Sequence, residues 1–410
     1  MTTELRVLSG SEWDVWLGCL ESAFGGVPIA PETREMYAEL TEPDRALGHW
    51  DGPDCVGTAG AHSFRVAVPG GAVVPAAGIT MVSVAATHRR QGLLTAMMRR
   101  QLDDVRSWGE PLAVLLASEP GIYGRFGYGA ATSEMNLRID SSRVLLSSPP
   151  GTDEIRLRQA SPARALDACE AVYGRLAASR PGTPLRQPGW ERVPVDDPER
   201  GRQGGSALRC VLAERDGEVT GYATYHLRPA WDDAGPKGTV AVRDLMALDP
   251  ASYAALWRFL FGIDLMSVVE CHNRPADDAV LRLVSDVRRC EVRLRDGLYV
   301  RLVELGAALE ARTYRTPVDV VMEVEDVFCP WNAGRWRLTA DSKGAATCRR
   351  TQDDPELALS VKELGAAYLG GVSLSTLAAA GLVRELRPGA LAGASSAFSS
   401  DIQPWCPHGF

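Results

Sequence analysis

The sequence carries the same hairpin pattern twice, about 160 residues apart. In residues 50–62 and again in residues 210–226, an apolar run ends at an Asp-Gly turn and a second apolar run with an internal glycine follows. Asp-Gly between two apolar runs is a strong short-range signal for an antiparallel hairpin. Each hairpin precedes one more strand-like run and then a helical pattern. We therefore expect an internal duplication of a mixed α/β domain.

Length and charge narrow the class of protein. A chain of 410 residues, 45% hydrophobic and 23% charged, has the profile of a soluble globular protein of about three domains. The net charge of −8 argues against a general nucleic-acid binder. Residues 1–54 hold eleven acidic residues and three arginines, so the whole excess lies there. It represents either a solvated helix face or an attraction for cationic partners.

Cysteine and histidine patterns exclude two further classes. The nine cysteines are odd in number and include no Cys-x-x-Cys pair, so neither a disulfide scaffold nor a zinc ribbon is expected. The six histidines form no His-Glu-x-x-His motif, and we expect no metal. The N-terminus lacks a signal pattern, and the weakly polar stretch 73–86 is too short to span a bilayer. We expect a cytoplasmic protein without a membrane span.

Helical and strand periods alternate in the first part of the chain. Pro31 is a favoured first-turn residue, and Ser11 is a candidate N-cap for the first helix. The glycine at 109 suits the end of a helix whose apolar face begins at Leu93. The expected elements are helices at 13–20, 31–40 and 93–105, and strands at 77–85 and 112–117.

The remainder of the chain divides into two further regions. The Ser- and Pro-rich segment 141–152 resembles a linker, and after it we expect helices at 163–178 and 253–261 around the second hairpin and a strand at 239–248. The third region has strand-like runs at 318–324, 335–340 and 357–361, and helix-like runs at 361–369 and 373–380. The predicted domains are 1–145, 146–296 and 297–410.

The strongest local motif is Arg89-Arg90-Gln91-Gly92-Leu93-Leu94, between an expected strand and an expected helix. Unpaired amides at a helix N-terminus attract phosphate, and a glycine there permits close backbone approach. Two arginines add charge-assisted hydrogen bonds to a pyrophosphate. The alternative is a basic turn before a core helix. In the second copy, Asp249-Pro250 replaces this turn, which indicates a structural repeat without the loop's chemistry.

These motifs together resemble the Eis family of acetyl-CoA-dependent GNAT acetyltransferases. The similar segments are 82–94, Ser118-Glu119, the run Ile-Tyr-Gly-Arg-Phe-Gly-Tyr-Gly at 122–129, Asp296 to Tyr299, and 308–312. The pyrophosphate loop departs from the family pattern only at Leu94. The resemblance implies two tandem GNAT-like domains, the second degenerate, followed by a sterol-carrier-like α+β domain. It also implies a homo-oligomer, a hexamer, which the periodicity of the chain does not itself indicate.

The resemblance also implies the roles of individual residues. Tyr123 would be the general acid, with Tyr128 as a rival donor, and the terminal carboxylate of Phe410 the general base. Such an acid protonates the departing thiolate, and such a base takes a proton from the acceptor ammonium. The residues expected to bind acetyl-CoA are Val82, Ser83, Val84, Arg89, Arg90, Gln91, Gly92, Leu93, Leu94, Thr95, Ser118 and Glu119.

The expected acceptor is the amine of a small polycation such as an aminoglycoside. Phe24, Tyr37, Asp296 and Tyr314 are expected to line its pocket, with Trp190 as a further contributor. The chain has Gly25-Gly26 and Gly409 where family members carry acids, and Glu32, Glu35 and Glu39 compensate in part. Two alternatives remain: acetylation of protein or peptide lysines, and a lipid carrier with a vestigial GNAT domain.

Overall fold

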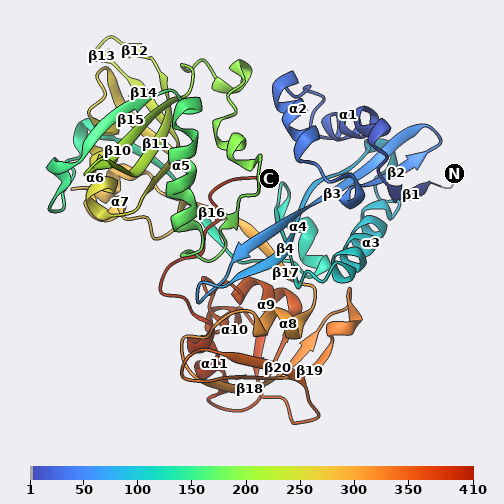
Figure 1. The fold of residues 1–410 in the computed structure, drawn as a ribbon. Coiled ribbons are helices and arrows are strands. Elements are labelled where there is room, and N and C mark those ends of the chain that lie inside the picture. The colour runs from blue at the N-terminus through green and yellow to red at the C-terminus, as the bar shows by residue number, and fades with distance from the viewer. Residues whose placement is uncertain (1–2) are drawn as a thin grey trace. The chain divides into compact units, whose positions relative to one another are not determined.

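The computed structural model describes residues 3–410, which form two compact units (Figure 1). The first unit contains residues 3–132, 297–404 and 409–410. The second contains residues 133–296 and 405–408. The C-terminal tail is thus divided between them, because four tail residues belong to the second unit and the last two to the first. The domain boundaries expected near 145 and 296 stay predictions.

The first unit is built on a mixed sheet in the order β1-β2-β3-β4-β5-β17-β6. Its strands are β1 (Glu4–Val7), β2 (Leu47–Asp51), β3 (Asp54–Ala67), β4 (Val73–Val84), β5 (Leu112–Leu116), β6 (Gly129–Ala130) and β17 (Leu298–Leu302). Its helices are α1 (Trp13–Ala23), α2 (Pro31–Leu40), α3 (Leu93–Ser107) and α4 (Pro120–Tyr123). The expected hairpin is confirmed, since β2 and β3 pair antiparallel through Asp51 and Asp54.

Of the two predicted helix starts, the one at Pro31 is confirmed and the N-cap at Ser11 is corrected. Pro31 opens α2, as expected, and Met97, Met98, Leu102 and Val105 of α3 are buried against the sheet. Ser11 is not the N-cap. Helical structure begins one turn earlier, after Ser9, whose backbone N–H donates to the Glu12 carboxylate at 3.1 Å. Ser9 and Glu12 thus form a capping box at this helical start.

The first unit also contains a C-terminal subdomain, residues 305–404. Its sheet has the order β20-β19-β18-β21-β22. The strands are β18 (Val318–Glu325), β19 (Gly334–Ala340), β20 (Ala346–Arg350), β21 (Leu357–Ser360) and β22 (Val383–Glu385). The helices are α8 (Leu305–Glu310), α9 (Val361–Ala367), α10 (Leu374–Ala379) and α11 (Ala390–Phe398). The elements β18, β19, β21, α9 and α10 were expected from the sequence, whereas β20, β22, α8 and α11 were not.

The second unit repeats the strand order of the first. Its sheet runs β16-β7-β15-β14-β11-β10-β8. The strands are β7 (Ser133–Asp140), β8 (Arg156–Ala160), β10 (Arg209–Arg215), β11 (Glu218–Arg228), β14 (Gly238–Ala247), β15 (Met266–Pro275) and β16 (Arg293–Asp296), with short strands β9 (Pro184–Leu185), β12 (Trp231–Asp232) and β13 (Gly235–Pro236). The helices are α5 (Pro162–Ala177), α6 (Pro250–Phe261) and α7 (Val280–Leu283). The second expected hairpin is β10–β11.

The segment expected to act as a linker is part of the second unit. Leu146 forms an antiparallel bridge with Val284, and Val144 is buried in the core of this unit. The Ser- and Pro-rich segment 141–152 is therefore a series of turns that packs on the second unit, not a linker.

Residues 405–408 of the tail are anchored within the second unit. The Trp405 ring lies in a core cluster with α5 and β11, and its indole N–H donates to the Asn273 carbonyl at 3.0 Å. The Asn273 amide in turn donates to the Cys406 carbonyl at 2.9 Å. The apolar C-terminus is thus packed, in agreement with its composition.

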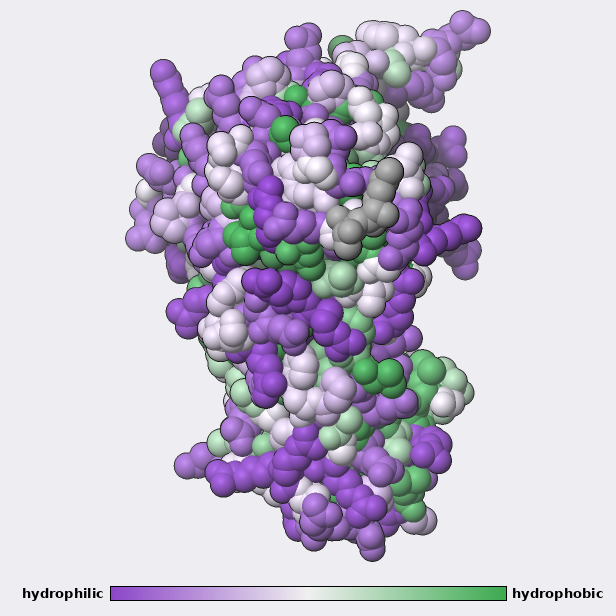
Figure 2. All heavy atoms as spheres, turned by 90° about the vertical axis from the view of Figure 1, so that its right-hand side faces the viewer, coloured by the Kyte–Doolittle hydropathy of each residue, from purple (hydrophilic) through white to green (hydrophobic). Residues whose placement is uncertain are grey.

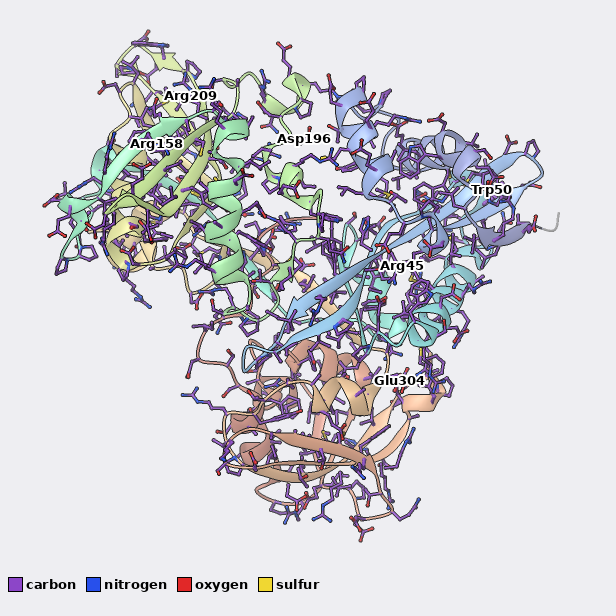
Figure 3. The ribbon with its side chains drawn as sticks, in the orientation of Figure 1. Arg45, Trp50, Arg158, Asp196, Arg209 and Glu304 are labelled. Atoms are coloured by element: carbon purple, nitrogen blue, oxygen red, sulfur yellow. The ribbon has the colours of Figure 1, made fainter. Side chains whose placement is uncertain are left out.

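All three arginines of residues 1–54 form ion pairs. Arg45 is labelled in Figure 3. Its guanidinium donates to both carboxylate oxygens of Glu110, at 3.0 and 2.7 Å, and lies over the Trp108 ring. Arg34 pairs with Asp14 and Glu21. Hydrophilic side chains cover most of the face shown in Figure 2, with apolar side chains in patches between them. Across residues 3–410, no helix has the length and apolarity to cross a membrane.

Candidate active site

A bulge in β4 opens a gap in the first sheet. Strand β4 pairs in parallel with β5 only as far as Gly78 and Val114. On its other side, the register with β3 shifts between Thr58 and Gly60, where Met81 adopts a left-handed φ of 51°. A bulge bends a strand and raises its twist. Beyond it, Ser83 and Val84 still pair with β3, but the opposite edge of Val82 to Val84 no longer pairs with β5.

The turn after β4 leads into α3 with its first amides uncapped. Gly92 occupies the N-cap position with a φ of 89°, and no side chain caps this helix end. Arg90 is also left-handed, with a φ of 62°, a backbone state that is uncommon for residues other than glycine and clusters at functional sites. The free amides and the partial positive charge of the helix start form an anion-binding end.

These elements enclose a cavity of about 670 Å³. Its walls include the ends of α1 and β4, the start of α3, and the segment after β5. The lining residues are Ala23, Phe24, Val82, Ser83, Val84, His88, Arg89, Arg90, Gly92, Leu93, Leu94, Thr95, Ser118, Glu119, Ile122, Tyr123 and Arg125. All residues expected to bind the cofactor are therefore present except Gln91, whose side-chain amide donates to the Thr87 carbonyl at 3.1 Å.

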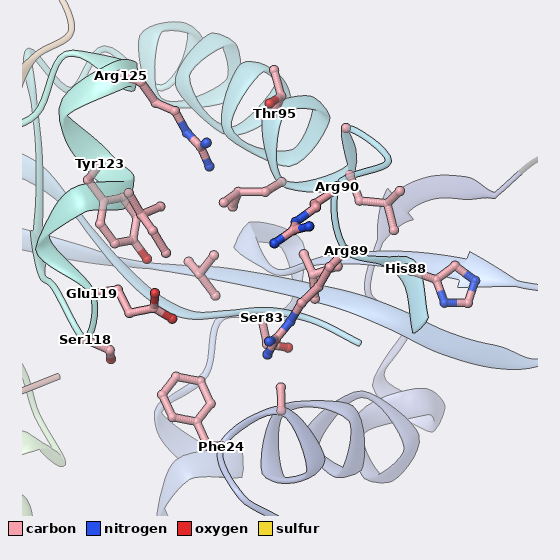
Figure 4. Close-up of a pocket in the computed structure, with 17 residues that line it drawn as sticks. Phe24, Ser83, His88, Arg89, Arg90, Thr95, Ser118, Glu119, Tyr123 and Arg125 are labelled. Carbon is pink, nitrogen blue, oxygen red and sulfur yellow. The ribbon is translucent and has the colours of Figure 1, made fainter. Parts of the chain in front are cut away.

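Three cationic side chains reach this cavity. Arg89 and Arg90 come from the expected loop, and Arg125 comes from the segment after β5 (Figure 4). Arg125 belongs to the 122–129 motif, but no binding role is predicted for it from the sequence, nor for His88, Ala23 or Ile122. Its position two residues after Tyr123 could have indicated that Arg125 lies near the same site.

Tyr123 presents its hydroxyl to the cavity. Figure 4 shows the hydroxyl directed inward from the end of α4, with Phe24 on another wall. Burial raises the pKa of Tyr123, and the nearby Glu119 carboxylate raises it further. The side chain is therefore protonated and neutral at physiological pH.

Tyr128, the rival donor, lies outside the cavity lining. Its side chain is fully buried, and its ring meets that of Tyr123 edge-on with 6.0 Å between centroids. Burial raises the pKa of Tyr128, and its hydroxyl has no hydrogen-bond partner within residues 3–410. The ring of Tyr128 therefore serves as packing for Tyr123.

The terminal residue is held against the same sheet. The Thr80 hydroxyl donates to a terminal oxygen of Phe410 at 2.9 Å, on the strand that carries Val82 two residues later. The Phe410 ring meets Phe64 edge-on with centroids 5.0 Å apart. A Cβ at Gly78 would lie 3.4 Å from that ring and 2.4 Å from Phe64, so a glycine leaves room for both rings.

The four residues expected to bind the acceptor lie in different surroundings. Phe24 lines the cavity and is 60% exposed, and Tyr37 lies half-buried on α2. Asp296, like Trp190, belongs to the second unit, so its role stays a prediction. The expectation for Tyr314 is wrong. Its side chain is 4% exposed in the core of the C-terminal subdomain, and its hydroxyl donates to the Leu309 carbonyl.

Comparisons with known proteins match this architecture. Family models described as acetyltransferase (GNAT) domains match residues 4–131 and 182–302, and a sterol carrier protein domain matches residues 305–407. An N-acetyltransferase of Streptomyces avermitilis is 67% identical over the whole of both chains. The N-acetyltransferase Eis of Mycobacterium bovis is 35% identical over 91% of each chain. The chain belongs to the Eis family of N-acetyltransferases.

A solved structure supports the same assignment. Eis1 from Mycobacterium abscessus is 36% identical, covers all of both chains and superposes with a TM-score of 0.84. A GCN5-related N-acetyltransferase from Anabaena variabilis has the same fold, with a TM-score of 0.84 at 20% identity. The predicted fold, two GNAT domains followed by a sterol-carrier-like domain, is confirmed, as is the prediction of an acetyltransferase.

The second GNAT domain of this Eis-family chain closes its equivalent site. At the start of α6, Asp249 accepts hydrogen bonds from the backbone N–H groups of Ala251 and Ser252, both at 3.0 Å, and pairs with Arg215. The helix start is thus occupied by the chain's own carboxylate. No comparable anion site remains there, in agreement with the predicted structural role of this repeat.

A second cavity, of about 280 Å³, lies in the same unit. It is lined by Arg138, Asp140, Ser142, Arg143, Lys237, Ser267, Val268, Arg288, Arg289 and Glu291. Carboxylates offset most of its positive charge. The ion pairs are Arg138 with Glu270 and Glu291, Arg143 with Asp140, Lys237 with Asp232, and Arg289 with Asp286. We assign no ligand to this cavity. No group of three metal-binding side chains occurs in residues 3–410.

Proposed function

We propose that this enzyme transfers the acetyl group of acetyl-CoA to primary amines of small polycationic molecules, aminoglycosides among them. The observation that carries the proposal is one cavity that combines an uncapped helix start, three arginines and an inward-facing tyrosine hydroxyl. The helix start and the arginines would hold the pyrophosphate of acetyl-CoA, and the tyrosine hydroxyl would face its thioester.

The cofactor would lie along β4 with its pyrophosphate at α3. The open edge of Val82 to Val84 offers backbone groups to the amides of pantetheine. The pyrophosphate would meet the free amides after Gly92 and the guanidinium groups of Arg89 and Arg90, which form charge-assisted hydrogen bonds with phosphate. This arrangement directs the thioester toward Ser118, Glu119 and Tyr123.

Acetyl transfer needs three proton movements, for which the chain supplies two groups. The acceptor ammonium gives its first proton to the Phe410 carboxylate, which Thr80 orients. The free amine attacks the thioester carbonyl, a carbon–nitrogen bond forms, and the carbon–sulfur bond breaks. The Tyr123 hydroxyl gives its proton to the departing thiolate, and the resulting tyrosinate takes the second proton from the acceptor nitrogen, which becomes the amide nitrogen. The raised pKa of Tyr123 keeps that proton in place until the sulfur acquires negative charge.

The preference for a cationic acceptor rests on acidity around the first two helices. Arg6 and Arg34 neutralise Glu12, Asp14 and Glu21. Glu32 and Glu35 remain exposed on α2, which follows the loop that begins at Phe24. Since Gly25-Gly26 and Gly409 replace expected acids, we propose a narrower or weaker aminoglycoside activity than a more acidic pocket would give.

The family resemblance is also the basis for proposing a cytoplasmic hexamer. Sedimentation velocity of the full chain tests the oligomer, and a stable monomer would contradict it.

Product analysis tests the proposed function. The enzyme is incubated with acetyl-CoA and a panel of aminoglycosides, linear polyamines and lysine peptides, and the products are weighed by mass spectrometry. We expect mass increases of one or more acetyl groups on the polycationic small molecules. Acetylation of lysine peptides alone would assign the acceptor to proteins, and no binding of acetyl-CoA by calorimetry would favour a carrier with a vestigial GNAT domain.

A further inference from the structure

The segment that carries Tyr123 rests on the C-terminal subdomain. After α4, the chain turns through Gly127, with a φ of 86°, and enters β6 at Gly129. Strand β6 pairs with β17, and α9 of the C-terminal subdomain packs on both strands. The surface beneath the proposed general acid is therefore built by a helix more than 230 residues further along the chain.

Two glycines make the contact between α9 and β6 unusually close. A Cβ at Gly129 would lie 2.0 Å from the Lys362 carbonyl oxygen and 2.4 Å from the Ala366 nitrogen. A Cβ at Gly365 would lie 2.3 Å from the Val300 carbonyl oxygen. In both cases the obstacle is backbone, so a side chain could be accommodated only by moving the helix away from the strands. The two glycines therefore fix the distance between α9 and the tyrosine segment.

A buried ion pair supports the turn from the same side. Arg301 of β17 is fully buried, and its guanidinium donates to both carboxylate oxygens of Asp326 at 2.9 and 2.7 Å. A Cβ at Gly127 would lie 2.8 Å from the central carbon of that guanidinium. Asp326 also accepts from the Cys329 backbone at 2.9 Å, so the pair is tied to the C-terminal subdomain.

The turn transmits this support to the tyrosine. The Tyr128 backbone N–H donates to the Tyr123 carbonyl, and the Tyr128 ring packs edge-on against the Tyr123 ring. Displacement of Gly127 or Gly129 would therefore displace Tyr123. A misplacement of about 1 Å at a reacting group can cost about 100-fold in rate.

We infer that α9, through Gly365, and the Arg301–Asp326 ion pair are positioning elements for the general acid. The C-terminal subdomain then contributes to acetyl transfer without touching either substrate. This inference rests on the proposed role of Tyr123. It also explains the spacing of the glycines in the 122–129 motif, since each of the last two faces a neighbour that leaves no space for a side chain.

Gly365→Ala tests the inference with a matched control. Gly393→Ala places the same methyl group on α11 of the same subdomain, where no atom lies within 4 Å. We expect Gly365→Ala to lower kcat about 10- to 100-fold, while the Kd for acetyl-CoA stays within about twofold. Gly393→Ala should leave both values unchanged, because alanine is favoured over glycine in a helix.

A double-mutant cycle with Tyr123→Phe separates positioning from general loss of structure. If Gly365→Ala acts through Tyr123, it adds little to the loss that Tyr123→Phe already causes. Multiplication of the two losses, or a normal kcat for Gly365→Ala, would overturn the inference. A near-normal kcat for Tyr123→Phe alone would instead overturn the proposed function, so the two failures are distinguishable.

Arg301→Lys provides a second route if Gly365→Ala does not fold. Lysine keeps the charge but lacks the planar guanidinium that lies under Gly127, donates through Nη2 to both oxygens of Asp326 and donates through Nη1 to the Leu302 carbonyl. We expect a decrease in kcat of about 3- to 10-fold that disappears in the Tyr123→Phe background. An unchanged kcat, or the same decrease in both backgrounds, would overturn the inference.

Discussion

The two GNAT domains treat the same strand–turn–helix junction in opposite ways. In the first, Gly92 leaves the amides at the start of α3 uncapped, and Arg89 and Arg90 face the cavity. In the second, the Asp249 carboxylate takes up the first amides of α6, and Arg215 pairs with that carboxylate. A helix start can thus bind an external anion only where no acidic side chain caps it, whereas a structural helix start is capped by an acid of the chain.

The gap beyond the paired part of the two parallel strands is open in the first domain and filled by a side chain in the second. In the first domain, the edge of Val82 to Val84 faces a cavity. In the second, strands β14 and β15 pair only as far as Val242 and Cys271, and the Arg274 side chain enters the gap to donate to the Leu245 carbonyl at 2.8 Å. Trp405 lies beside this arginine, 5.4 Å from the guanidinium carbon. The fold provides the gap twice, and side chains decide whether it holds a ligand.

The largest expected effect comes from removal of the two proposed proton-transfer groups of the first domain, Tyr123 and Phe410. Tyr123→Phe should lower kcat about 10²- to 10⁴-fold, the usual contribution of a general acid, with acetyl-CoA binding retained. Deletion of Phe410 should lower it on a similar scale, since the terminal carboxylate then no longer meets Thr80. Steady-state release of CoA thiol measures the rate, and calorimetry measures binding. Near-normal turnover of both variants would refute the roles.

A smaller effect is expected when the first helix start is made to resemble the second. Gly92→Asp places a carboxylate at the N-cap of α3, where it would compete with pyrophosphate for the amides and repel it. Charged hydrogen bonds are worth about 1.5–3 kcal/mol, so we expect the Kd for acetyl-CoA to rise about 10- to 100-fold.

Gly92→Asn is the matched control for that exchange. Asparagine has the same shape and the same backbone requirement at a φ of 89°, but it carries no charge. It should weaken acetyl-CoA binding several-fold less than aspartate does. Equal weakening by both residues would show that backbone strain, and not charge, is responsible.

A still smaller effect is expected from opening the second helix start. Asp249→Ala removes a cap and should lower the free energy of unfolding by about 1 kcal/mol. It should leave kcat and the stoichiometry of acetyl-CoA binding unchanged, because Arg274 still fills the strand gap. Chemical denaturation measures the stability, and calorimetry the number of sites. A second equivalent of bound acetyl-CoA would contradict the comparison.

Local features of both domains could be predicted from the sequence, and long-range ones could not. The proposed phosphate loop is a run of consecutive residues, so its pattern and spacing can be recognised in the sequence. Arg274 and Trp405 are 131 positions apart, and only the folded chain brings them together. Tyr314 illustrates the same limit, because an aromatic residue next to a buried arginine has the same local sequence whether it lines a pocket or fills a core.

The smallest expected effect concerns the pH dependence of the first site. Burial and the Glu119 carboxylate both raise the pKa of Tyr123 above its ordinary value of about 10. The tyrosine therefore stays protonated, and able to donate, throughout the range from pH 7 to pH 9, and its loss as an acid begins only above its ordinary pKa. Glu119→Gln removes the negative charge and should move the alkaline limb of the kcat profile downward by a fraction of a pH unit. An upward movement of this limb in Glu119→Gln, or a wild-type limb near pH 8 that Tyr123→Phe abolishes, would contradict the assigned environment of Tyr123.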